Sequence, residues 1–131
     1  MDFNSIIFFC YRSAQLIAQY RPRAVIMAVT RSLKTARHMH LHRGCCPVYI
    51  APTRNTNYDK DGEPLFKQHH ISANQALSMS EWLLDVDARV IDAIKLGKAR
   101  GIVSTGDAVI VLTGWRPGYG TTNTLRIIYS D

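Results

Sequence analysis

Short apolar, β-rich runs alternate with helical patterns along this chain, and that alternation limits the possible folds more than any other feature. Strands that alternate with helices indicate βαβ units, in which crossover helices join parallel strands. The predicted strands cover 5–10, 24–29, 48–50, 108–113 and 123–129, and the predicted helices cover 13–20, 32–42 and 80–98. We therefore expect an α/β fold built around a mostly parallel sheet.

Residues at the ends of the predicted helices support these boundaries. Pro22 ends the first helix, Ser32 is placed to cap the second, and Gly44 ends that second helix. The third helix has the strongest pattern, because its small and apolar residues recur three or four positions apart. This stripe, which we expect to pack on the sheet, consists of Leu83, Val86, Val90, Ile94 and Gly97.

A polar segment rich in Asn, Asp, Pro and Gly interrupts the pattern at about 52–78. A loop of this length is unusual in a compact domain, so we interpret it as a surface insertion, with a functional flap as the alternative. The adjacent His69 and His70 offer too few ligands for a metal site. With 131 residues, the chain has the size of one domain with one core.

The net charge of +6 predicts an anionic partner. Lys and Arg are scattered without a continuous run, which favours a compact anion over nucleic acid.

Three cysteines without a CxxC pair indicate neither a disulfide framework nor zinc, and a reducing, cytoplasmic location is expected. The apolar run at 6–10 is too short to span a membrane, so no membrane partner is expected. Cys45 and Cys46 are interpreted as small core residues.

Trp82 and Arg89 are the first candidate ligand residues. They lie seven positions apart on the predicted third helix, within about 20° of each other around its axis. An aromatic ring and a guanidinium so placed can grip a phosphate together. The alternative is an exposed ion pair between Asp85 and Arg89, four positions apart and contributing a few tenths of a kcal/mol. The pattern alone does not decide between them.

The segment that joins the last two predicted strands is the second candidate. Its glycines let backbone approach a ligand, and its Trp-Arg pair forms a cationic aromatic tip; the alternative is a long hairpin turn. The candidate residues are Gly114, Trp115, Arg116, Pro117, Gly118 and Gly120. The chain has no phosphate-binding or dinucleotide-binding glycine motif and no combination of acid, base and nucleophile, so we predict no catalytic residue.

Several motifs together resemble one known family. They are YRPRA at 20–24, AVTR at 28–31, TAR at 35–37, HLHRG at 40–44, DVDARV at 85–90, GKARG at 97–101 and TGWRPGYGTTNTLR at 113–126. In this order and spacing, they resemble the C-terminal domain of pyruvate kinase. The resemblance implies a five-stranded sheet, four strands parallel and the last antiparallel, with helices on both faces.

The resemblance also implies a role in glycolysis without a catalytic centre in this chain. In that family the sites for phosphoenolpyruvate, ADP, magnesium and potassium lie on a barrel and its lid domain, which are absent here. We therefore expect a regulatory and assembly domain, truncated at its start, whose partners are the catalytic barrel and the other subunits of a homotetramer. The alternative is a free-standing basic α/β domain that binds a phosphorylated metabolite or RNA without kinase activity.

The family resemblance assigns an effector site to this domain. Many eukaryotic members bind fructose 1,6-bisphosphate here; Trp82 and Arg89 match the pair that holds its 1-phosphate, and the segment 114–121 matches the lid. A Thr-x-Ser-Gly-x-Ser turn holds the other phosphate, but residues 8–13 here read Phe-Phe-Cys-Tyr-Arg-Ser. Arg12 and Ser13 are the candidates in this turn, and only Ser13 fits its pattern.

Two features of the resemblance bear on affinity and assembly. Losing two charge-assisted hydrogen bonds, at roughly 1.5–3 kcal/mol each, weakens binding by about a hundredfold or more. We therefore expect half of an effector site. Ile127, Ile128 and Tyr129 lie on the expected edge strand and offer an open edge for pairing with a second copy.

Overall fold

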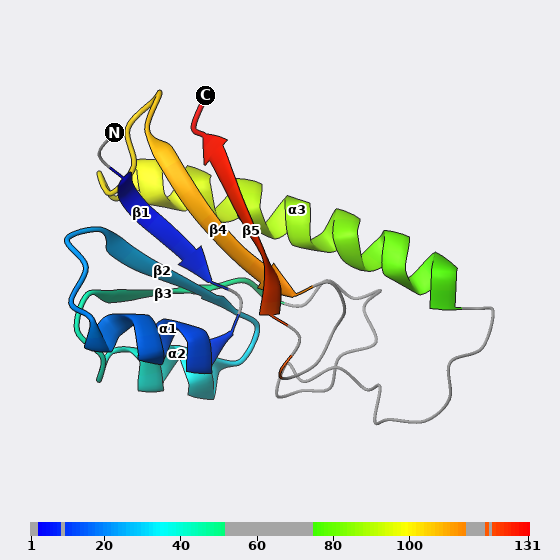
Figure 1. Ribbon diagram of the computed structural model, residues 1–131, viewed down its shortest axis with the longest axis horizontal. Helices are drawn as coiled ribbons and strands as arrows, with labels where there is room; N and C mark the ends of the chain where they lie inside the picture. The colour runs from blue at the N-terminus through cyan, green and yellow to red at the C-terminus, as the bar shows by residue number, and fades with distance from the viewer. Residues whose placement is uncertain (1–2, 9, 52–74, 115–119, 121) are drawn as a thin grey trace.

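The computed structural model describes residues 3–8, 10–51, 75–114, 120 and 122–131 (Figure 1). The strands are β1 (Phe3–Phe8), β2 (Val25–Thr30), β3 (Cys45–Tyr49), β4 (Ala108–Gly114) and β5 (Thr122–Tyr129). The helices are α1 (Tyr11–Gln19), α2 (Leu33–Met39) and α3 (Gln75–Ala99). In this part of the chain no helix is both long and apolar enough to cross a membrane.

The strands form one sheet in the order β3-β2-β1-β4-β5. The central strand β1 is parallel to β2 and β4, and β2 is parallel to β3. Only the last pair, β4 and β5, is antiparallel. The predicted α/β fold, mostly parallel with an antiparallel last strand, is confirmed.

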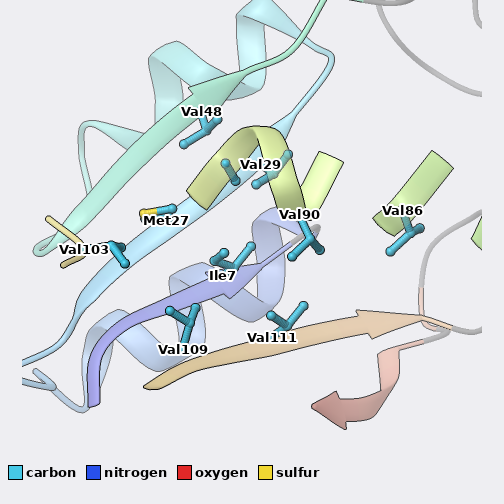
Figure 2. Close-up of a cluster of buried hydrophobic side chains, with 10 residues drawn as sticks. Ile7, Met27, Val29, Val48, Val86, Val90, Val103, Val109 and Val111 are labelled. Carbon is cyan, nitrogen blue, oxygen red and sulfur yellow. The ribbon is translucent and has the colours of Figure 1, made fainter. Parts of the chain in front are cut away.

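Helices cover both faces of this sheet, with α1 and α2 on one face and α3 on the other (Figure 1). Alternate residues of each strand point to opposite faces, so each face has its own buried cluster. Figure 2 shows the cluster between α3 and the sheet, which consists of Ile7, Met27, Val29, Val48, Val86, Val90, Ala93, Val103, Val109 and Val111. The cluster beneath α1 and α2 consists of Phe8, Ala14, Ala18, Ile26, Ala28 and Met39. These clusters hold the three layers together.

The start of α2 agrees with the sequence prediction, whereas its end does not. The Ser32 hydroxyl caps the helix by accepting a hydrogen bond from the backbone N–H of Thr35 at 3.2 Å. The helix ends at Met39, three residues before the predicted end. Gly44, at φ +71°, lies instead in the turn that leads into β3, where its carbonyl accepts a hydrogen bond from Ile26.

Three other predicted boundaries are wrong. β3 begins at Cys45 and contains Pro47, which an edge strand tolerates because its outer side forms no ladder hydrogen bonds. α1 begins at Tyr11, two residues before the predicted start, so Arg12 lies in its first turn together with Ser13. α3 begins at Gln75, inside the segment 52–78 that was predicted to be a polar insertion.

The predicted buried stripe of α3 is confirmed at Val86, Val90 and Gly97, and it is wrong at Leu83. Leu83 is 52% exposed, whereas Ala93, which was not predicted, is fully buried beside Val86 and Val90. Gly97 belongs to the stripe for a steric reason, because a Cβ there would lie 3.0 Å from Val103 and 3.1 Å from Met27. The absence of a side chain at Gly97 lets the end of α3 approach β2 closely.

β5 is an edge strand, as predicted. Its side chains alternate, so that Leu125, Ile127 and Tyr129 are exposed on one face while Ile128 packs against the cluster beneath α3. Ile127, Ile128 and Tyr129 thus lie on the edge strand, as predicted, while the side chain of Ile128 packs inward. The exposed apolar side chains of β5 lie on the face of the sheet that carries α1 and α2.

Candidate functional site

The carboxyl ends of the parallel strands form the edge of the sheet where α/β proteins bind ligands. The strand order reverses between β1 and β4, since β1 leads into α1 on one face and β4 follows α3 on the other. Phe8 at the end of β1 pairs with Leu112 near the end of β4. The candidate segments after these two strands, 12–13 and 114–120, therefore start from neighbouring points on the same edge.

Trp82 and Arg89 are in contact on α3. The guanidinium carbon of Arg89 lies 4.9 Å from the centroid of the Trp82 ring, within the range of a cation–π interaction. Arg89 is buried, with 7% of its surface exposed. The indole Nε1 of Trp82 is also buried and has no hydrogen-bond partner among the described residues. The structure therefore brings together the two residues that the sequence analysis paired.

Asp85 connects this pair to the sheet. Arg31 donates a hydrogen bond from Nη2 to Asp85 Oδ1 at 2.5 Å, and Arg89 Nη2 lies 3.0 Å from Asp85 Oδ2. Arg89 also donates from Nε to the backbone carbonyl of Asp85 at 3.4 Å. Arg31 directly follows β2, so these contacts place the middle of α3 at the carboxyl end of that strand.

The ion pair between Asp85 and Arg89, which was the alternative interpretation of the pattern, is thus present together with the Trp82 contact. It is not the exposed pair that was predicted, because the side chains of Arg31, Arg89 and Asp85 are only 5%, 9% and 23% exposed. An estimate of a few tenths of a kcal/mol does not apply to buried charges, whose partners must offset the loss of hydration.

Sequence reasoning missed the role of Arg31. It entered only as the last letter of the AVTR motif, and its partner lies 54 positions away in the chain. One available signal was its position, since an arginine directly after a buried strand lies at the ligand-binding edge of a parallel sheet.

The β1–α1 end of the site is apolar by comparison. Arg12 is exposed on the first turn of α1, and Ser13 is half-buried. Cys10, the N-cap of α1, makes no side-chain capping hydrogen bond. A shallow cavity of about 230 Å³ lies here, lined by Phe8, Ser13, Leu16, Ile17, Leu112 and Thr122. Such a lining offers a phosphate few hydrogen-bond donors.

The segment between β4 and β5 is described only at its ends. Gly114 pairs with Thr122 across the two strands, and Gly120 has φ +74°, in the left-handed region that favours glycine. Because β4 and β5 are consecutive and antiparallel, the segment connects a hairpin. Trp115, Arg116, Pro117 and Gly118, predicted as ligand residues, lie outside the described residues.

The two neighbouring cysteines have different surroundings. Burial, with a smaller contribution from Cys46, raises the pKa of the Cys45 thiol, which packs near the cluster beneath α1 and α2. The sulfur of Cys46 accepts a hydrogen bond from Nη1 of Arg100 at 3.1 Å. Cys45 therefore fits the predicted role of a small core residue, while Cys46 has a polar partner.

Comparisons with known proteins identify relatives of this chain. A family model described as "Pyruvate kinase, alpha/beta domain" matches residues 12–77 and 70–128. The chain is 44% identical to pyruvate kinase PKLR of Rattus norvegicus and 43% identical to that of Homo sapiens, over 89% of this chain and 16% of each relative. It is 35% identical to the pyruvate kinase of Agaricus bisporus, over 88% of this chain and 18% of the relative.

The chain thus spans less than a fifth of the length of these curated relatives, while the family model covers most of the chain itself. The matched residues include Arg12, Ser13, Arg31, Trp82, Asp85 and Arg89 of the candidate site. The sequence similarity and the mixed five-stranded α/β sheet lead to the same assignment. The chain belongs to the pyruvate kinase family and corresponds to its alpha/beta domain.

Proposed function

We propose that this chain is a regulatory and assembly domain of a pyruvate kinase, and that the carboxyl edge of its sheet binds a sugar-phosphate effector such as fructose 1,6-bisphosphate. The observation that carries the proposal is the contact between Trp82 and Arg89 beside the end of β2. Family membership supports the first part, and the chemistry of this pair supports the second.

A phosphate group suits the surroundings of Trp82 and Arg89. A guanidinium donates paired, charge-assisted hydrogen bonds to phosphate oxygens, and such bonds strengthen where water is excluded. The buried indole N–H of Trp82, which has no acceptor among the described residues, supplies a further donor. The tryptophan ring also limits the positions that the Arg89 side chain can adopt. Together these groups favour a compact dianion over a neutral sugar hydroxyl.

The proposal assigns no chemical step to this chain. Phosphoryl transfer from phosphoenolpyruvate to ADP, with its magnesium and potassium ions, would belong to the catalytic barrel of a cytoplasmic pyruvate kinase. The domain would bind that barrel and pair with other subunits of a homotetramer. The exposed apolar side chains of Leu125, Ile127 and Tyr129 on the edge strand β5 support the assembly role, because such an edge readily pairs with a second chain.

Titration calorimetry with fructose 1,6-bisphosphate tests the proposal. Replacing Arg89 with methionine keeps an unbranched apolar stem but removes the charged guanidinium, and we expect the affinity to fall by about tenfold to a hundredfold. The matched control is Arg126→Met, since Arg126 pairs with Asp87 of the same helix at 2.8 Å but makes no described contact with Trp82. Equal affinity in the wild type and Arg89→Met would rule out this site.

A further inference from the structure

We propose that Arg31 is a positioning residue that sets the phosphate affinity of Arg89 by holding the carboxylate of Asp85. This inference rests on the proposed function, because it concerns the regulation of the same effector site. The contacts that carry it join three side chains from two parts of the fold, namely Arg31 after β2 and Asp85 and Arg89 on α3.

Asp85 lies between two guanidinium groups and uses a different oxygen for each. Oδ1 accepts a hydrogen bond from Arg31 at 2.5 Å, whereas Oδ2 lies 3.0 Å from Arg89. The closer contact is therefore with Arg31. The side chains of both arginines are less than a tenth exposed, so water screens these interactions weakly.

A carboxylate and a phosphate compete for the same guanidinium, because both are bound through paired hydrogen bonds to planar N–H groups. Asp85 and Arg89 are four positions apart on one helix, and Arg89 Nε already contacts the backbone carbonyl of Asp85. Without Arg31, both carboxylate oxygens could turn toward Arg89. Arg31 keeps one oxygen engaged and so leaves Arg89 better able to bind an added anion.

Arg31 is well placed for this role because its backbone is fixed independently of α3. It directly follows β2, and the next residue, Ser32, donates a backbone hydrogen bond to the Thr30 hydroxyl at 3.1 Å. The Ser32 side chain then caps α2. The turn that carries Arg31 is thus joined to β2 on one side and to the capped helix α2 on the other.

The test measures the affinity of the full chain for fructose 1,6-bisphosphate by calorimetry in a double-mutant cycle. Arg31→Met should weaken binding by about tenfold, the effect of losing one charged interaction. Arg31→Lys, which keeps a cation for Oδ1, should bind close to wild type. Asp85→Asn should bind more tightly than wild type, because it removes the competing charge. The double variant of Arg31→Met and Asp85→Asn should match Asp85→Asn alone.

The outcomes separate this inference from the proposed function. If the wild type fails to bind, or if Arg89→Met binds as the wild type does, the proposed function fails and this inference fails with it. If Arg89→Met loses affinity but Arg31→Met does not, only the inference is overturned. It is also overturned if Arg31→Met weakens binding equally with Asp85→Asn present, since Arg31 would then contact the ligand directly. Thermal unfolding shows whether each variant is folded. If Arg31→Met does not fold, the affinities of Arg31→Lys and Asp85→Asn decide the question, and the inference is overturned if Asp85→Asn does not bind more tightly than Arg31→Lys.

Discussion

The two ends of the proposed effector site differ in what their residues do for the fold. At the α3 end, Arg31, Asp85 and Arg89 form a buried charged cluster against Trp82. At the β1–α1 end, the lining is mostly apolar, and Phe8 there is a core residue with 1% of its surface exposed. One end carries buried charged side chains, while the other mainly completes the packing beneath α1.

Under the proposed function, this difference means that the fold keeps one half of the effector site while the other half has changed. Each charged side chain in the α3 cluster contacts one of opposite charge, so a single substitution leaves a buried charge with fewer partners. The described residues at the start of α1 form no buried ion pair, and packing beside β1 can tolerate a range of apolar side chains.

The largest effect expected from this comparison is on stability. Asp85→Ala removes the carboxylate that the buried guanidinium groups of Arg31 and Arg89 both contact. It should lower the free energy of unfolding by about 3 kcal/mol. Asp87→Ala, also on α3, breaks the more exposed pair with Arg126 of β5 and should cost less than about 1 kcal/mol. Denaturant unfolding of both variants measures the difference. Equal losses would show that the α3 cluster is no more important than a surface ion pair.

A smaller effect is expected on ligand affinity. Trp82→Leu at the α3 end should weaken the binding of fructose 1,6-bisphosphate by about tenfold, because it removes the ring beside Arg89 and an N–H donor. Ser13→Ala at the β1–α1 end should change affinity by less than about twofold, because we expect the Ser13 hydroxyl to bind no phosphate. Calorimetry compares the two, and a larger loss for Ser13→Ala would reverse our assignment of the ends.

The smallest effect concerns the ligand itself. If only the α3 end holds a phosphate strongly, fructose 1,6-bisphosphate should bind no more than about threefold tighter than fructose 1-phosphate. Competition between the two sugars in one calorimetric series measures this ratio. A preference for the bisphosphate of about a hundredfold would mean that the β1–α1 end binds a second phosphate after all.

Much of the fold could be predicted from the sequence because its signals are local. The alternation of strands and helices and the Ser32 cap each depend on a few neighbouring residues, and the structure agrees with both. Boundaries were less reliable, since Pro47 lies inside β3 only because that strand is at the edge of the sheet. Leu83 was wrongly assigned to the buried stripe, because helical spacing does not show which turns of the helix the sheet covers.

The candidate site was harder to predict because it depends on contacts between distant positions. Trp82, Asp85 and Arg89 could be grouped, since they lie on one helix at helical spacing. The contact of Arg31 with Asp85 depends on how α3 crosses the end of β2, and no local pattern contains that information. The burial that distinguishes this cluster from a surface ion pair likewise comes from the packed sheet.

The measurement that tests our central claim most directly is an NMR titration of the ¹⁵N-labelled chain, observing the indole N–H of Trp82. The chain has two tryptophans, so Trp82→Phe assigns the signal by its disappearance. We predict that fructose 1,6-bisphosphate shifts this signal saturably in the wild type and not in Arg89→Met. If the signal stays still while calorimetry detects binding, the ligand binds elsewhere and the account of the α3 end is wrong.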